Sequence, residues 1–186
     1  MWMRILGYYQ IKDDKFFHKL IGQGVDTDND GIISPEEAEV VSYLFFKGDS
    51  IEDLTGIEAF INLDTLICVE NMLTYLDVSM NTKLTSLYCW GNALASLDIS
   101  QNLALKRLDC SSNRLSNLDV SNNTNLELLY CYWNHLSSLD VTNNSNLEIL
   151  WCQGGKTVLV DHPKPESLTT RQIIKYTFKG CDTKYY

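Results

Sequence analysis

The segment DTDNDGIISPEE, residues 26–37, places oxygen-bearing side chains at regular intervals along one loop. Asp26, Asp28 and Asp30 take the first, third and fifth of its twelve positions, and Glu37 takes the last. Calcium prefers six to eight hard oxygen ligands, and this alternation lets a single loop wrap its carboxylates around one ion. The segment therefore predicts a Ca²⁺ site.

This spacing resembles the EF-hand calcium loop, in which a glycine at the sixth position, here Gly31, permits the sharp turn. The resemblance implies that Ile32 offers its backbone carbonyl, that Ser34 acts directly or through water, and that Glu37 binds through both oxygens. The alternative is that Glu37 only caps a helix, which would leave crowded carboxylates without a compensating cation. Dockerin segments carry similar loops, but in two copies, and this sequence has one. A single loop favours a structural ion over a regulatory one.

Two helices are expected to flank the loop. The run KFFHKLIGQ places Phe16, Phe17, Leu20 and Ile21 on one helical face. Ser34 is followed by a proline and, three residues on, by Glu37, which predicts the capped start of a second helix over EEAEVVSYL.

From residue 63 onward the sequence repeats with a strict step of 21 residues, in the unit LxxLxCxxNxLxxLD(V/I)(S/T)xN. Five columns keep this step: Leu63, Leu84, Leu105, Leu126 and Leu147; Leu66, Leu87, Leu108, Leu129 and Leu150; Cys68, Cys89, Cys110, Cys131 and Cys152; Asn71, Asn92, Asn113 and Asn134; Asp77, Asp98, Asp119 and Asp140. So short a unit cannot bury its own apolar face, but stacked copies can. In each copy xLxCx predicts a short strand whose Leu and Cys point inward.

The pattern resembles the leucine-rich repeat of bacterial surface proteins, and it is similar to small proteins of gut bacteria with Cys at the third apolar position. Residues 41–155 carry the resemblance, with one irregular 22-residue unit ahead of the regular copies. The resemblance implies an α/β solenoid, mainly β, whose short parallel sheet lines a concave face. It also implies an extracellular or cell-surface setting.

The periodic cysteines and aspartates have structural interpretations. Zinc sites use closely paired cysteines such as CxxC within one loop, and these thiols are 21 residues apart. We therefore expect a ladder of small inward hydrophobes, with Cys181 outside it and of unknown role. The aspartate column is expected to cap turns rather than to bind metal.

The outward strand positions differ from copy to copy and are rich in aromatic residues: Tyr88, Trp90, Tyr130, Tyr132, Trp133 and Trp151, with Arg107 and Asp109 between them. Strands favour aromatic residues in general, so the rings could simply stabilise the sheet. A contiguous apolar patch at solvent-facing positions is, however, typical of an interaction site, and Tyr and Trp carry much of the energy of interfaces. We expect this face to bind a protein or a glycan. A spacer domain without a dedicated ligand is the alternative.

Charge, hydropathy and motifs argue against several classes of function. The net charge of −9 argues against a nucleic-acid partner, which would need a clustered basic face. No apolar run approaches the ~20 residues of a transmembrane helix, and the first residues do not form a signal peptide. No catalytic motif is present, and the three histidines do not suggest a triad or a metal cluster. We expect a monomeric protein that is not an enzyme.

The sequence thus predicts three parts: a helical N-terminal cap at 1–40 that contains the calcium loop, repeats at 41–155, and a β-rich C-terminal cap at 156–186. The last part holds two β-prone runs, TVLV and QIIKYTF, around a proline-containing loop. Caps of this kind would cover sheet edges that would otherwise be open to aggregation.

Overall fold

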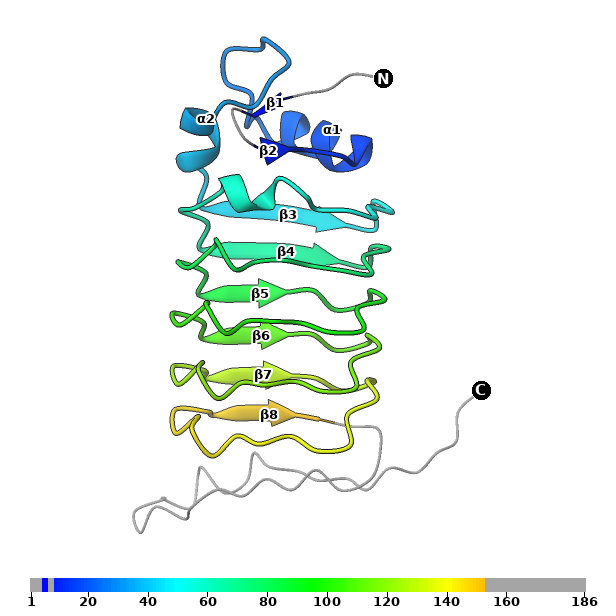
Figure 1. Ribbon diagram of the computed structural model, residues 1–186, viewed down its shortest axis with the longest axis vertical. Coiled ribbons are helices and arrows are strands. Elements are labelled where there is room, and N and C mark those ends of the chain that lie inside the picture. Colours follow the sequence, from blue (N-terminus) through cyan, green and yellow to red (C-terminus); the bar gives the residue numbers. More distant parts are fainter. Residues whose placement is uncertain (1–4, 7–8, 153–186) are drawn as a thin grey trace.

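Six strands lie side by side in one parallel sheet, in the order of the sequence (Figure 1). They are β3 (Tyr43–Lys47), β4 (Thr65–Val69), β5 (Ser86–Tyr88), β6 (Arg107–Asp109), β7 (Leu128–Tyr130) and β8 (Ile149–Trp151). The computed structural model describes residues 5–6 and 9–152. The predicted C-terminal cap and Cys181 lie outside this range.

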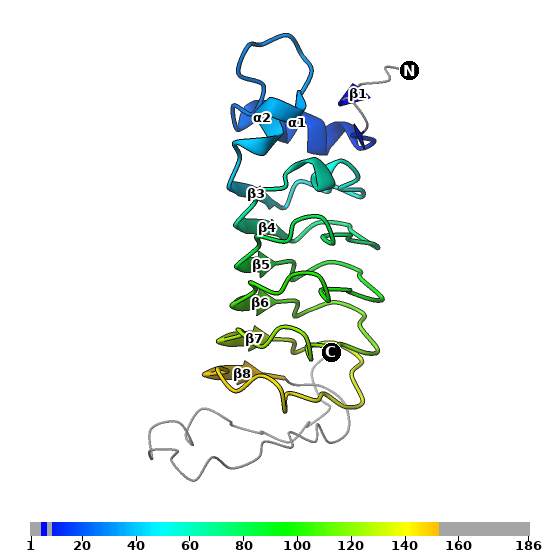
Figure 2. The same cartoon turned by 60° about the vertical axis from the view of Figure 1, so that its left-hand side comes forward.

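Each strand begins one coil of a solenoid, and the chain returns on the far side of the stack before the next strand starts. Figure 2 shows the strands along one side and the return segments along the other. Neighbouring strands pair in register with the 21-residue step, as Leu87 pairs with Leu108 and Leu108 with Leu129. The predicted repeat solenoid, mainly β, is confirmed.

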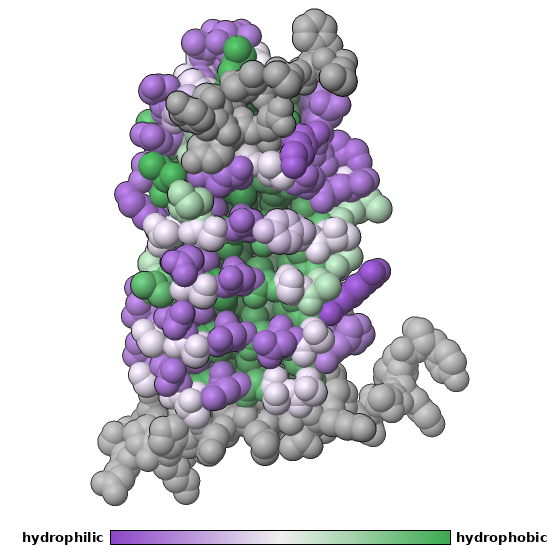
Figure 3. Space-filling view, viewed as in Figure 1, coloured by the Kyte–Doolittle hydropathy of each residue, from purple (hydrophilic) through white to green (hydrophobic). Residues whose placement is uncertain are grey.

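The core is a set of inward columns that run the length of the stack. The leucine columns are buried in every coil that the structure describes, and Cys68, Cys89, Cys110 and Cys131 are buried with them. On the face seen in Figure 3, hydrophilic side chains form bands that follow the coils, with hydrophobic atoms visible between the bands. Each coil therefore buries its apolar side against the next coil and keeps its polar side in water.

Asparagine side chains close the turn after each strand. Asn113, for example, donates from Nδ2 to the carbonyl oxygens of Cys89, Cys110 and Ser111 at 3.0–3.1 Å, and its Oδ1 accepts from the backbone N of Leu94 at 3.0 Å. A second buried asparagine column crosses the return segments: Asn81, Asn102, Asn123 and Asn144. The Nδ2 groups of both columns donate to backbone carbonyl oxygens that the turns would otherwise leave unpaired, because a buried unpaired C=O is costly.

Two helices stand at the β3 end of the stack, α1 (Asp14–Gly22) and α2 (Pro35–Glu39), together with the short antiparallel pair β1 (Ile5–Leu6) and β2 (Tyr9–Gln10). A short 3-10 turn, η1 (Ile57–Ala59), lies in the first coil. No helix among the described residues is long and apolar enough to cross a membrane.

Helix α1 has the predicted buried face. Its N-cap Asp13 accepts from the backbone N of Lys15 and Phe16, and Phe16 packs edge-on against Phe46 of β3 with ring centroids 5.3 Å apart. Aromatic pairs of this kind add to the stabilisation from burial. The helix is thereby fixed to the first coil.

Helix α2 begins as predicted but is shorter than the segment EEAEVVSYL. Ser34 is its N-cap, with a capping box to Glu37, and the helix ends at Glu39. From Tyr43 the chain alternates exposed and buried residues and pairs with β4, because strand pairing buries Leu44 and Phe46 in the core. Tertiary packing here overrides the local helical pattern.

Candidate functional site

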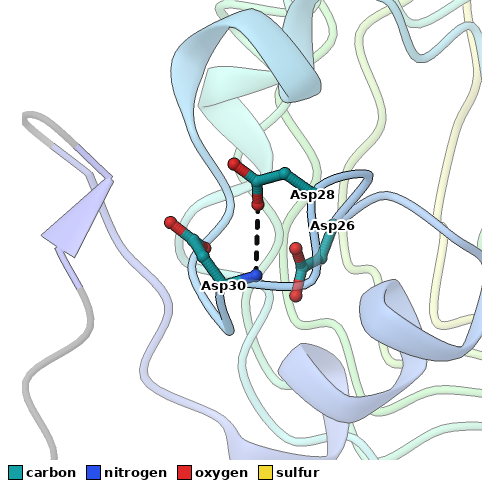
Figure 4. Close-up of side chains that lie close together, drawn as sticks. All are labelled: Asp26, Asp28 and Asp30. Atoms are coloured by element: carbon teal, nitrogen blue, oxygen red, sulfur yellow. Dashed lines mark hydrogen bonds between the residues drawn. The ribbon is translucent and has the colours of Figure 1, made fainter.

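The loop of residues 26–37, which we call the acidic loop, brings three of its carboxylates together as predicted. One oxygen each from Asp26, Asp28 and Asp30 lies within 4.8 Å of the others (Figure 4). The backbone turns through left-handed conformations at Asn29 (φ 60°) and Gly31 (φ 78°), and this winding directs the three side chains inward.

Hydrogen bonds within the loop occupy only some of the carboxylate oxygens. The Gly31 backbone N donates to Oδ2 of Asp26 at 3.0 Å, and the Asp30 backbone N donates to Oδ1 of Asp28 at 3.1 Å. Asp26 is 8% exposed, and its Oδ1 is buried with no hydrogen-bond donor. A buried carboxylate oxygen without a donor is unfavourable unless a cation neutralises it, so the three residues fit a divalent cation.

Glu37, the last residue of the loop, is fully hydrogen-bonded. Its Oε1 accepts from the backbone N and hydroxyl of Thr27, and its Oε2 accepts from the backbone N and hydroxyl of Ser34. Hydrogen bonds from the Ser34 and Thr27 backbone lower the pKa of Glu37 to about 2. Glu37 therefore does cap the helix. To bind an ion through both oxygens, it would have to give up its hydrogen bonds with Thr27 and Ser34. Ile32 is exposed, while Ile33 anchors the loop in the core.

The outward positions of the strands form a second candidate site, which we call the sheet face. Its members stand in register across neighbouring strands, as Tyr88, Asp109, Tyr130 and Trp151 do on β5 to β8. The sheet face thus brings together residues that are 21 positions apart in the sequence.

Four of the predicted aromatic residues pack into one group at the β7–β8 end, which we call the aromatic cluster: Tyr130, Tyr132, Trp133 and Trp151. Ring centroids are 5.5 Å apart for Tyr130 and Trp151, 5.7 Å for Tyr132 and Trp151, and 5.3 Å for Tyr132 and Trp133. Even so, Trp133 is 66% exposed and Trp151 is 55% exposed. The cluster holds its rings in place while leaving much of them open to solvent.

Trp133 has an unfavourable backbone conformation. In four successive coils, the residue just before the turn asparagine adopts positive φ: Glu70 (53°), Gly91 (71°), Ser112 (52°) and Trp133 (52°). Glycine tolerates this region without penalty, and a bulky residue there is an outlier. This column was not predicted from the sequence, although Gly91 in one copy was a signal of it.

Tyr88 and Trp90 lie apart from the aromatic cluster and are half-buried. The Nζ of Lys47 stands 5.9 Å from the Trp90 ring centroid, a cation–π contact that extends the sheet face to β3. On β3 itself, Tyr43 and Phe45 are exposed on the same face. These two residues were not predicted from the sequence, and the alternation in YLFFK around the buried Leu44 and Phe46 was the signal that could have found them.

Arg107 and Asp109 lie on β6, between Tyr88 and the aromatic cluster. Arg107 is exposed, and its Nη2 is 3.9 Å from Oε2 of Glu127. Asp109 was expected to face solvent but is 9% exposed, because larger side chains stand on both neighbouring strands and Ser111 packs beside it. Its Oδ1 accepts from both the backbone N and the hydroxyl of Ser111.

The cysteine column and the aspartate column of the repeat have the structural roles expected of them. Burial raises the pKa of the Cys68 thiol to about 12 and the pKa of Cys110 still further, which disfavours the thiolate form of these cysteines. Each aspartate of the Asp77–Asp140 column accepts a hydrogen bond, 2.9 Å long, from the backbone N of the residue two positions further on. Asp98 accepts it from Ser100 and Asp119 from Ser121. Both columns serve the fold.

The 21-residue coils, the inward leucine columns and the asparagine-closed turns define a leucine-rich repeat solenoid. Among solved structures the chain is similar to the functional domain of InlJ from Listeria monocytogenes, which includes a cysteine ladder. The two share 34% identity with a TM-score of 0.68, over 79% of this chain and 34% of that chain. The chain thus spans about a third of the length of that domain.

Two further structures share the fold. Internalin C2 from Listeria monocytogenes has 21% identity and a TM-score of 0.60, over 77% of this chain and 75% of that chain. The leucine-rich repeat ectodomain of the receptor kinase SOBIR1 from Arabidopsis thaliana has 25% identity and a TM-score of 0.54, over 66% and 72%. No protein-family model and no curated protein matches the sequence.

Proposed function

We propose that this chain is a non-catalytic recognition module that binds a protein partner through the sheet face. The observation that carries the proposal is the aromatic cluster, in which Trp133 and Trp151 remain more than half exposed although ring contacts hold them in place. Rigid, exposed Tyr and Trp side chains are the groups that dominate the energy of protein interfaces. The structural likeness to internalins and to a receptor ectodomain supports an interaction role and an extracellular setting.

The conformation of Trp133 favours binding over sheet stabilisation as the purpose of the cluster. A left-handed conformation costs an L-residue roughly 1–2 kcal/mol, and the same position is glycine in the β5 coil. A ring that served only to stabilise the sheet would gain little from a position that destabilises the backbone. The turn of the repeat imposes this conformation, since Glu70 and Ser112 share it, but it does not require an exposed tryptophan there.

The test compares the native chain with a Trp133→Ala, Trp151→Ala double variant on arrays of extracellular proteins and of glycans. Tyr75→Ala is the matched control, because Tyr75 is also an exposed aromatic residue but lies outside the sheet. The expected result is protein binding that the double variant loses and the control keeps, with both variants folded by their melting curves. Binding to glycans alone would show that the partner is a glycan and not a protein. Binding that the double variant retains would favour a spacer domain.

We also propose that the acidic loop binds one structural Ca²⁺ through Asp26, Asp28 and Asp30. The buried Oδ1 of Asp26, which has no donor, supports this proposal, and the loop lies at the β3 end of the stack beside α2. Bound calcium would hold the carboxylates of the loop together and so stabilise the N-terminal cap that contains it. Whether Ile32, Ser34 and Glu37 complete the ligand set stays a prediction.

Melting of metal-stripped protein with and without calcium tests this second proposal. A structural ion at 100 times its Kd adds about 2.7 kcal/mol to the free energy of unfolding. The native chain and an Asp140→Asn control should therefore melt at higher temperature in calcium, and Asp26→Asn should not respond. Equal melting temperatures of the native chain with and without calcium would refute the structural ion.

A further inference from the structure

Asp109 is a buried charged residue on the sheet face. It occupies an outward strand position, yet it is 9% exposed, and its in-register neighbours on β5 and β7 are Tyr88 and Tyr130. A carboxylate therefore lies between two tyrosines on the sheet face. Charged residues are rarely placed so deeply unless they are paired.

The structure provides Asp109 with hydrogen bonds but with no cation. Both donors from Ser111 reach Oδ1, and Oδ2 has no hydrogen-bond or ion-pair partner among the described residues. The nearest basic residue along the same strand, Arg107, pairs with Glu127 instead. Burial raises the pKa of the Asp109 carboxyl, and the hydrogen bonds from Ser111 act in the opposite direction.

The repeat itself does not require this carboxylate. The positions equivalent to Asp109 and Ser111 are Tyr88 and Trp90 in the preceding coil and Tyr130 and Tyr132 in the following coil, and these coils make the same asparagine-closed turn. A structural role in the turn therefore does not explain Asp109. Asp109 is instead a largely buried carboxylate whose Oδ2 keeps contact with solvent and has no partner among the described residues, so a cationic ligand group could reach it and pair with it.

We propose that Asp109 anchors a basic side chain of the protein partner, an arginine guanidinium seated between Tyr88 and Tyr130. This inference rests on the proposed function of the sheet face. Strands two apart are separated by about 9–10 Å at the backbone. A flat group in van der Waals contact with an aromatic ring on each side needs roughly 7–8 Å between the rings. The spacing of β5 and β7 is therefore compatible with a planar cation that sits over Asp109 between rings carried by these two strands, a position that we call the slot.

The chemistry of the slot favours arginine over other cations. The guanidinium is planar and weakly hydrated, and it combines hydrogen bonds to a carboxylate with stacking on aromatic rings. A divalent metal ion would need several oxygen ligands, and Asp109 is the only carboxylate on the outward positions of β5, β6 and β7. The chain's net charge of −9 also matches a basic partner.

The inference is tested by NMR titration of the folded chain with N-acetyl-arginine amide and with its neutral isostere, N-acetyl-citrulline amide. We expect saturable shifts of the Asp109 and Ser111 amide signals with the arginine probe, and at least ten-fold weaker binding of the citrulline probe. The Asp109→Asn variant should lose this difference. Asp119→Asn, the same chemical change at an exposed aspartate outside the sheet, should behave as the native chain.

The difference between the two probes tests the slot on the native chain even without a variant. Equal shifts with both probes, or none with either, would overturn the arginine slot. Asp109→Asn should fold, because its side-chain oxygen can still accept from Ser111. A protein partner that the Trp133, Trp151 double variant loses, but that Asp109→Asn binds with native affinity, would also overturn the slot while leaving the proposed function intact.

Discussion

The side-chain amide of Gln23 pairs with the backbone of Phe45 as a neighbouring strand would. Its Oε1 accepts from the Phe45 backbone N at 3.1 Å, and its Nε2 donates to the Phe45 carbonyl oxygen at 3.1 Å. Phe45 lies at the centre of β3, the first strand of the sheet. One side chain thus occupies the edge at which another chain could otherwise add a strand.

Replacing Gln23 by alanine should destabilise the chain and expose this edge. Each lost hydrogen bond is worth about 0.5–1.5 kcal/mol, so the free energy of unfolding should fall by about 1–3 kcal/mol. Urea unfolding measures the change, and light scattering measures the expected self-association. Gln101→Ala is the control, because the Gln101 amide contacts only the neighbouring Ser100 hydroxyl at 3.4 Å. Equal urea midpoints and equal mass for the two variants would contradict the edge-pairing role.

Trp133→Gly and Trp133→Ala should differ in stability but not in binding. Both remove the ring that contacts Tyr132, so both should lose the partner. Glycine adopts φ near 52° without strain and alanine does not, so Trp133→Gly should be the more stable by about 1 kcal/mol. Paired thermal and urea melts measure the difference. Equal stability of the two variants would show that the left-handed backbone carries no strain.

Asn113→Ala should be among the most destabilising polar substitutions in the repeats. It leaves the Leu94 backbone N and several buried carbonyl oxygens without their partner, and each such group costs about 1–3 kcal/mol. We expect the free energy of unfolding to fall by at least about 2 kcal/mol. Asn122→Ala, at an exposed asparagine with one 3.4 Å contact, should change it little. Similar losses for both variants would argue against the turn-closing role.

Acid should destabilise the calcium-free chain partly through Glu37. The pKa of this carboxyl is lowered to about 2 in the folded chain from an ordinary 4.5, so the folded state favours the ionised form. Its contribution is fully present above pH 4.5 and is lost as the pH falls toward 2, with a slope of at most about 1.4 kcal/mol per pH unit. Urea unfolding between pH 6 and 2.5, with chelator, measures the slope.

Glu37→Gln provides the comparison for this acid dependence. The variant should have a shallower slope than the native chain over the same range, because glutamine does not titrate. Other groups with lowered pKa values, such as Asp98 and Asp119, titrate equally in both proteins and cancel in the difference. Identical slopes for the two proteins would mean that the Glu37 hydrogen bonds do not persist in solution.

The repeat and its core could be predicted from the sequence because each inward position recurs every 21 residues. Leu108 and Cys110 face the core for the same reason as Leu87 and Cys89, because the same inward positions recur in five copies of the repeat. The capping box at Ser34 could also be predicted, because it depends on two residues only three positions apart. The spacing of Asp26, Asp28 and Asp30 likewise predicted that they would converge.

The sequence by itself determined which residues face inward, where the chain turns and where the carboxylates gather, because these depend on local spacing and period. Only the tertiary structure decided how residues from different coils meet. It buries Asp109 between Tyr88 and Tyr130, where the sequence predicted a solvent-facing residue, and it brings Gln23 to the edge of β3. Burial, the pKa of a buried carboxyl and ring contacts depend on neighbours across the stack, and the linear sequence does not specify how closely those neighbours approach.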